Sequence, residues 1–237
     1  CFGGGGGQQV GTAGYEYWPR ACTWSGSSNS WASLHPIGAS YSRAVVTDGT
    51  TQAGWLAFDG GTMRASIWHG TPVSWRDITP SNAVWGQVTG MSDGRQAGSA
   101  GIVSENGYSA HAGIWSGTAE SWVDLHPAGA AMSQAYAIKG HNQVGYIYPD
   151  HDHPISHASL WHDTAESCID LHPAGATSSV ALARPTGAED RLSPCRDWRA
   201  WAILPVLARL AAHASASLAR SRDHTRSAIP SERRSVL

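Results

Sequence analysis

One short segment of the chain alternates acidic and histidine side chains that could ligate a metal ion. The candidate ligands are Asp150, His151, Asp152, His153 and His157. Carboxylate and imidazole groups at this density suit Zn²⁺ or another transition metal. No Cys-x-x-Cys or His-Glu-x-x-His frame accompanies them, and a solvated loop is often built from such residues. The segment therefore predicts either a metal site or a polar loop.

A second group of carboxylates recurs along the chain, at Asp77, Asp124 and Asp170. A ring of carboxylates at one level could bind cations or polarise a substrate. A residue that recurs in unit after unit usually serves the unit itself, because catalysis needs different roles at different positions. We therefore expect each Asp to close a turn, next to the recurring histidines His35, His126 and His172.

Sequence motifs for nucleophilic catalysis and phosphate binding are missing. The chain has no Cys/His/Asn or Gly-x-Ser-x-Gly frame for a nucleophile and no Gly-Lys-Ser/Thr loop to hold a phosphate, so no cofactor is predicted. The four cysteines, Cys1, Cys22, Cys168 and Cys195, could form two disulfides in a secreted chain. Cys22 and Cys168 stand where the other repeats carry other residues, which favours free, partly buried thiols.

The aromatic residues are mainly tryptophans, with 12 Trp against 2 Phe. Two sets recur in register and are expected to pack in the core: Trp24, Trp68, Trp115 and Trp161, and Trp31, Trp75 and Trp122. Trp18, Trp55 and Trp85 fall outside this register. Surfaces that bind glycans or proteins use aromatic side chains of this kind, so these three are the candidate ligand-binding residues.

Tandem repeats would position all these side chains. The Gln-x-Gly motif begins at Gln9, Gln52, Gln96 and Gln143, so the spacings are 43, 44 and 47 residues, and a tryptophan follows each motif. The repeats predict a domain over 1–184. Its units are expected at about 3–44, 45–87, 88–135 and 136–183.

Each unit is predicted to contain four short strands separated by Gly, Ser, Asn and Pro. In the third unit we expect them at 96–102, 111–115, 121–125 and 133–138. Four strands in about 45 residues is the size of a β-propeller blade, whereas helical repeats would show a 3.6-residue period. The sequence thus predicts an all-β fold, a β-propeller-like array of about four four-stranded repeats, with a β-solenoid or an open stack of small sheets as the alternative.

The segments that lead to two of the tryptophans carry a family resemblance. They read His-Ala-Gly-Ile-Trp over 111–115 and His-Ala-Ser-Leu-Trp over 157–161, and each follows a Gln-x-Gly strand. This pattern resembles the HAF-type extracellular repeat of secreted bacterial proteins, named for a His-Ala-Phe signature. The third signature residue is Cys22, Ser66, Gly113 or Ser159 here and never Phe, and an Asp-Leu-His-Pro mark is added. The resemblance implies an extracellular or cell-surface, propeller-like, non-enzymatic module, and it carries over no catalytic residues.

The repeat pattern stops after residue 184. Residues 185–237 hold 9 Arg against 5 Asp plus Glu, although the whole chain has a net charge of −2. A helix is expected over 201–219, and the basic tail predicts a docking segment, a disordered terminus or an out-of-frame translation. No run of about 18 apolar residues occurs, so no transmembrane segment is predicted.

Together these patterns favour an extracellular scaffold or binding module with no catalytic site. Its expected partner is a glycan or a protein surface, and the lack of an overall positive charge argues against nucleic acid. The alternative is a secreted propeller hydrolase acting on polysaccharide, in which carboxylates of different blades converge on the central channel. Because the chain opens with Cys1 rather than Met, we expect it to be a piece of a longer array.

Overall fold

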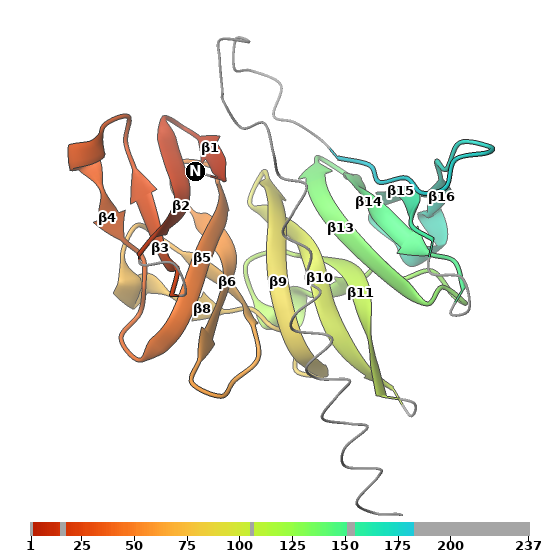
Figure 1. Cartoon of the computed structure of the whole chain (residues 1–237), viewed down its shortest axis with the longest axis horizontal. Coiled ribbons are helices and arrows are strands. Elements are labelled where there is room, and N and C mark those ends of the chain that lie inside the picture. The colour runs from red at the N-terminus through yellow and green to blue at the C-terminus, as the bar shows by residue number, and fades with distance from the viewer. Residues whose placement is uncertain (1, 15–17, 105–106, 151–154, 183–237) are drawn as a thin grey trace, which may run out of the picture. The chain divides into compact units, whose positions relative to one another are not determined.

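The computed structural model describes residues 2–14, 18–104, 107–150 and 155–182 (Figure 1). The chain divides into two compact units, residues 1–185 and 186–237, and every described residue belongs to the first. The basic tail and its expected helix lie outside the described residues. The described helices are single 3-10 turns, and none of them could span a membrane.

The described chain folds into four antiparallel sheets of four strands each, which follow one another as the blades of a β-propeller (Figure 1). Blade 1 contains β1 (Gly3–Gly5), β2 (Gln8–Ala13), β3 (Arg20–Trp24) and β4 (Ala32–Ser33), and blade 2 contains β5 (Ala39–Thr47), β6 (Gln52–Phe58), β7 (Arg64–Trp68) and β8 (Arg76–Asp77). Blade 3 contains β9 (Ala83–Ser92), β10 (Arg95–Ser104), β11 (Gly107–Trp115) and β12 (Val123–Asp124), and blade 4 contains β13 (Met132–Lys139), β14 (Asn142–Tyr148), β15 (His157–His162) and β16 (Ile169–Asp170). The predicted all-β, propeller-like array is confirmed.

The outermost strand of each blade is only two residues long. A 3-10 turn precedes each one: η1 (Ser28–Ser30), η2 (Pro72–Ser74), η3 (Ala119–Ser121) and η4 (Ala165–Ser167). In blade 3, Pro127 follows three residues after β12. Because a proline lacks an N–H and restricts the residue before it, it cannot continue the ladder. The strand expected at 121–125 is shorter than predicted at both ends, because Ser121 belongs to η3 and the chain turns after Asp124 towards Pro127.

The strand expected at 133–138 exists, but it belongs to blade 4. It forms the core of β13, which pairs with β14 rather than with β12. The first strand of blade 3 is instead β9, which pairs with β10. Each blade therefore begins with the strand that the sequence pattern assigned to the end of the preceding unit.

Three buried clusters lie between successive blades. Between blades 1 and 2, Val10, Ala21 and Leu34 pack with Ala44, Leu56 and Trp68. The cluster between blades 2 and 3 contains Trp115, and the cluster between blades 3 and 4 contains Trp161. The first recurring tryptophan of each blade thus packs against the preceding blade.

The expectation that both tryptophan sets are core is only partly met. Trp68, Trp115 and Trp161 are fully buried, but Trp24 is only partly buried. In the second set Trp75 and Trp122 pack against the buried clusters, whereas Trp31 is 49% exposed. Both exceptions lie in blade 1. No described blade precedes it, so no neighbouring blade covers these two side chains.

The small residues at Ser66 and Gly113 have a structural reason. In blade 3 the ring of Trp122 lies directly over Gly113, and a Cβ at Gly113 would overlap that ring. In blade 2 the Trp75 Nε1–H donates a hydrogen bond to Ser66 Oγ at 3.0 Å. In blades 2 and 3 a large side chain at this position would collide with the tryptophan that covers it.

Both the glutamine and the glycine of the Gln-x-Gly motif have a structural role. Gln96 Oε1 accepts a hydrogen bond from the Gly117 N–H at 2.9 Å, and its Nε2 donates to the Gly94 carbonyl oxygen at 2.9 Å. Gly98 lies at an irregularity of the β9–β10 ladder, where a Cβ would overlap the Gln87 carbonyl oxygen. Equivalent overlaps would occur at Gly54 and Gly145.

Candidate functional site

The recurring aspartates close the turn after each outer strand, as predicted. Each accepts a hydrogen bond from the backbone N–H two residues later: Asp77 from Thr79 at 2.8 Å, Asp124 from His126 at 2.9 Å and Asp170 from His172 at 2.7 Å. In blade 1 Ser33 Oγ accepts the same bond from His35 at 3.2 Å. These contacts are Asx-type turns, in which a short polar side chain accepts from the backbone.

The recurring histidines tie each blade to the next one. Ser133, on the first strand of blade 4, accepts a hydrogen bond from the Ala112 N–H at 2.8 Å. Its hydroxyl lies 2.8 Å from His126 Nδ1, and His126 Nε2 lies 3.0 Å from the Ala130 carbonyl oxygen. In a neutral imidazole these contacts are satisfied when Nε2 carries the proton and donates to the carbonyl oxygen. The same pairs are His35 with Ser42 and His172 with Ser179.

Blade 2 bonds the equivalent backbone N–H with a residue of its own rather than with one of the next blade. Thr79 replaces the histidine, and Thr79 Oγ1 itself accepts the hydrogen bond from the Ala65 N–H at 2.9 Å. We call these contacts the junction nodes. They account for the recurring histidines without metal ligation.

Ser109, His111 and Asp124 lie in the order of a nucleophile relay. Ser109 Oγ is 2.9 Å from His111 Nε2, and His111 Nδ1 is 2.7 Å from Asp124 Oδ2. A serine, histidine and aspartate in this order activate the serine in many hydrolases. Ser109 was not among the predicted site residues, because a Ser-x-His on a strand has no distinctive spacing.

The other blades indicate a structural use for the same pair. In blade 4, His157 Nδ1 lies 2.8 Å from Asp170 Oδ2, but Ile155 stands where blade 3 has Ser109. In blade 2 an arginine takes the place of the histidine, with Arg64 Nη1 3.7 Å from Asp77 Oδ2. The pairing thus recurs without a nucleophile, which indicates that it holds the third strand of a blade against the fourth.

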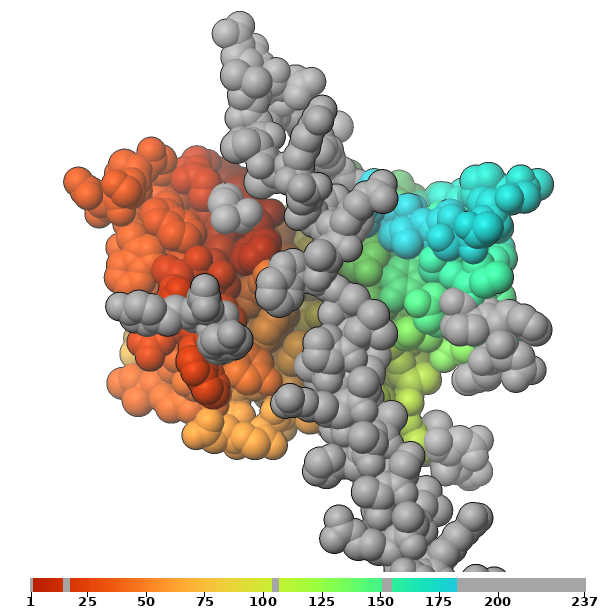
Figure 2. Space-filling view, in the orientation of Figure 1, coloured from red at the N-terminus to blue at the C-terminus, as the bar shows by residue number. Residues whose placement is uncertain are grey.

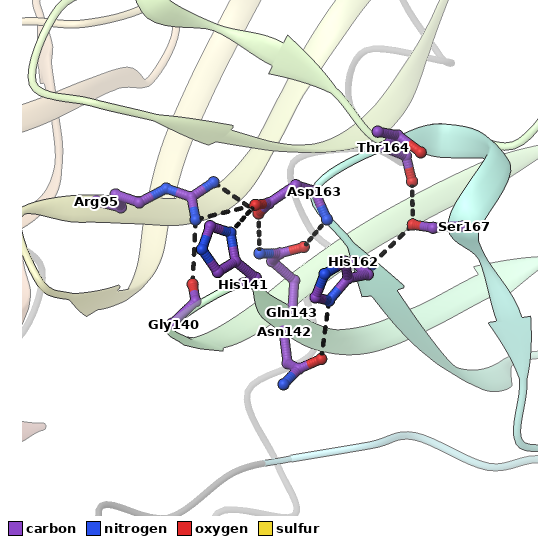
Figure 3. Close-up of polar contacts among 9 residues, drawn as sticks. All are labelled: Arg95, Gly140, His141, Asn142, Gln143, His162, Asp163, Thr164 and Ser167. Carbon is purple, nitrogen blue, oxygen red and sulfur yellow. Dashed lines mark hydrogen bonds and ion pairs between the residues drawn. The ribbon is translucent and has the colours of Figure 1, made fainter.

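A polar cluster around Asp163 joins blades 3 and 4 (Figure 3). Arg95 Nη2 donates to Asp163 Oδ1 at 2.6 Å, and Arg95 Nη1 also donates to the Gly140 carbonyl oxygen at 3.1 Å. His141 Nδ1 contacts Asp163 Oδ2, and Gln143 Nε2 donates to Asp163 Oδ1 at 2.7 Å. Gln143 Oε1 in turn accepts the Asp163 N–H at 2.9 Å.

Asp163 stands where the other blades have a glycine. Its φ is +63°, and the equivalent Gly26, Gly70 and Gly117 have φ values of +82°, +76° and +82°. An aspartate tolerates this left-handed conformation better than most residues do. The departure from glycine is the sequence signal that could have indicated this cluster.

Asp163 is ionised over the whole neutral range. Burial opposes its ionisation, but hydrogen bonds from Arg95, His141 and Gln143 outweigh that effect and lower its pKa to about 2. The carboxylate contributes stability above its unfolded-state pKa of 3.8, and this contribution is lost as the pH falls towards about 2.

We expect Asp163→Asn to lower the free energy of unfolding at pH 7 by about 1 kcal/mol, a modest value because the ion pair is partly solvated. Asparagine also adopts a left-handed backbone, so the loss would come from the charge. Urea unfolding of the two proteins should converge as the pH falls from 4 to 2. Asp93→Asn is the matched control, since Asp93 also has a positive φ of +54°, and equal losses in both variants would contradict this assignment.

The predicted metal segment is only partly described. His151, Asp152 and His153 lie outside the described residues, Asp150 is exposed, and the His157 ring contacts Asp170. Within the part of the chain that the structure describes, no group of three or more His, Cys, Asp or Glu residues could hold a metal ion. The metal site stays a prediction.

The three candidate ligand-binding tryptophans differ in their surroundings. Trp18 is 57% exposed. Trp55 is partly buried and meets Tyr41 edge to face, with 5.6 Å between ring centroids. Trp85 covers Gly101, where a Cβ would overlap its indole. Only Trp18 offers an open aromatic surface.

Two cysteines can be assessed, and both are free thiols. Burial raises the pKa of Cys22 and of Cys168, so both thiols are protonated at neutral pH. Cys1 and Cys195 lie outside the described residues. Because Cys168 replaces a tryptophan, a shallow hollow of about 330 Å³ remains beside it, between Glu166 and His126. The hollow thus reflects a missing indole between two blades.

Comparison with known proteins adds no relative. A scan against models of protein families and a search of curated proteins found no match to this chain.

Proposed function

We propose that the protein is a non-catalytic scaffold or binding module that acts outside the cell or at its surface, built from HAF-type bacterial repeats. A β-propeller fits a scaffold or binding role, because its blades present loops and edges on a rigid frame. One observation carries the proposal: the recurring Asp, His and Gln side chains each bond to their own blade or to the next one. The repeating chemistry therefore serves the architecture.

The proposed partner is a glycan or a protein surface, and we place its contact at Trp18. An exposed indole offers a large apolar face and one N–H donor, which suits stacking on a sugar ring. Trp55 and Trp85 are less accessible, so we expect them to support this surface rather than to form it.

Electrophoresis in gels that contain soluble xylan or hydroxyethyl cellulose tests this proposal. We expect the polysaccharide to retard the protein and Trp18→Ala to restore most of its mobility. Tyr108→Ala is the matched control, because Tyr108 is an exposed aromatic residue on β11 of blade 3. Retardation that both variants retain would rule out Trp18, and no retardation in either gel would count against a glycan partner of this class.

The second candidate is a hydrolase, and the Ser109–His111–Asp124 relay is the observation that favours it. Such a relay would suit ester groups on a polysaccharide better than its glycosidic bonds, which need a pair of carboxyl groups. The recurrence of the His–Asp pair without a serine in blade 4 weighs against it.

A fluorophosphonate probe separates the two candidates. We expect no covalent labelling, because a relay also needs donors that stabilise the oxyanion and a site that excludes water. Mass spectrometry of the intact chain would report one adduct if Ser109 were activated. Labelling that disappears in Ser109→Ala, together with ester release from acetylated xylan, would overturn the non-catalytic proposal.

A further inference from the structure

The two faces of each blade are not alike. The leading face carries the recurring tryptophan and packs against the preceding blade, and the trailing face packs against the following one. On the trailing faces of blades 1, 2 and 3, the apolar residue after the outer strand is 0%, 1% and 0% exposed, at Leu34, Ile78 and Leu125. The corresponding Leu171 of blade 4 is 45% exposed.

Other positions on the blade 4 trailing face show the same difference. Leu160 is partly exposed, whereas the equivalent Ile67 and Ile114 are each 3% exposed. Val144 is also partly exposed, although its equivalents Val10, Ala53 and Ala97 are fully buried. Apolar side chains that three blades bury are therefore left uncovered by the described residues in the fourth.

The leading face of blade 1 is the complementary half. Trp24 is partly exposed and Trp31 is 49% exposed, although their equivalents pack against a preceding blade. Blade 1 (red) and blade 4 (green to cyan) lie on opposite sides of the view in Figure 2. The leading face of blade 1 and the trailing face of blade 4 are thus the two halves of the interface between successive blades, which forms three times within the chain.

The chain continues the junction pattern beyond blade 4. His172 Nδ1 lies 2.7 Å from Ser179 Oγ, and the Ala181 N–H donates to the Gly145 carbonyl oxygen at 3.0 Å. Residues 176–182 thus lie against blade 4 as the first strand of a following blade would. Blade 4 thus makes the contacts that the other blades make with a following first strand, but its Leu171 remains exposed.

We propose that blade 1 of a second copy of this chain docks on the trailing face of blade 4, with Trp24 of one copy over Leu171 of the other. This docking would continue the interfaces inside the chain, where the same residue types pair across each blade boundary. Such an interface is heterologous, because it joins two different faces, and it builds rings or short chains rather than an isologous dimer.

Sedimentation equilibrium of the full chain tests this association. We expect a mass that rises with concentration above 25.0 kDa, and a return to monomer in both Trp24→Asp and Leu171→Asp. Each variant retains one intact face, so an equimolar mixture should form a dimer and nothing larger. Trp24→Ser is the milder alternative if the aspartate variant loses its β-sheet circular dichroism.

Ile169→Asp is the matched control for Leu171→Asp. Ile169 is 53% exposed and lies two residues away, but its equivalent Val123 stays 43% exposed in blade 3, which does have a following blade. The control should associate like the parent chain. A chain that stays monomeric at every concentration would overturn the proposal. A mixture of Trp24→Asp and Leu171→Asp that fails to form a dimer would also overturn it. So would association that appears only after truncation at residue 182, since the trailing face of blade 4 would then belong to residues 183–237.

Discussion

Replacing Trp115 with alanine should lower the free energy of unfolding by about 3–5 kcal/mol, the usual cost of deleting a large buried aromatic side chain. Trp115 is fully buried between blades 2 and 3, and its ring lies 4.5 Å from that of Trp122, centroid to centroid. Urea unfolding followed by circular dichroism would measure the loss. A loss below about 1 kcal/mol would place the indole at the surface instead.

Two further variants control this measurement. Trp24→Ala removes the same side chain at the equivalent position of blade 1, where it is only partly buried, so we expect less than half of the loss. Trp115→Phe keeps most of the apolar volume. The Trp115 Nε1 has no hydrogen-bond partner among the described residues, so this change should cost about 1–2 kcal/mol. Equal losses for Trp24 and Trp115 would contradict the difference between the blades.

Introducing a side chain at Gly98 should be nearly as costly. A Cβ there would overlap the Gln87 carbonyl oxygen, which is a backbone atom of the neighbouring strand and cannot rotate away. We expect Gly98→Ala to lower the free energy of unfolding by about 2–3 kcal/mol, because the irregular part of the β9–β10 ladder would have to shift. The same urea experiment would measure it.

Gly101→Ala provides the control for Gly98. A Cβ at Gly101 meets the Trp85 indole rather than backbone, and a side chain that is only partly buried can move aside. We expect this variant to cost less than Gly98→Ala. If the two changes cost the same, the close backbone approach would not explain the glycine of the Gln-x-Gly motif.

The repeat period predicted the number of blades and most strands, but it did not predict where a blade begins. A tandem repeat looks the same in every phase, so the strand over 133–138 could close the third unit or open the fourth. The pairing of β13 with β14 decides between them. Ser133 confirms the link, because it belongs to blade 4 and yet accepts the N–H of Ala112 in blade 3.

The site residues divide in the same way between local and distant contacts. The turns closed by Asp124 and Asp170 were predictable, because their partners lie two residues away. The Asp163 cluster was not, because Arg95 is 68 residues distant and no motif links the two. The prediction that Trp24 is buried like its equivalents in the other blades was wrong, since burial depends on a neighbouring blade as well as on the residue.

The junction nodes determine how the protein can come apart. The first strands of blades 2 and 4 supply the hydroxyl that bonds the third strand of the preceding blade, so cutting the chain between those sheets removes a buried partner from one of them. Amide hydrogen exchange should therefore be slowest in β6 and β10, at the centres of blades with a neighbour on both sides, and faster in β2 and β14. Blade 3 excised by gene engineering would therefore need the chain as far as Ser133 of β13 to keep the Ala112 N–H of its own third strand bonded.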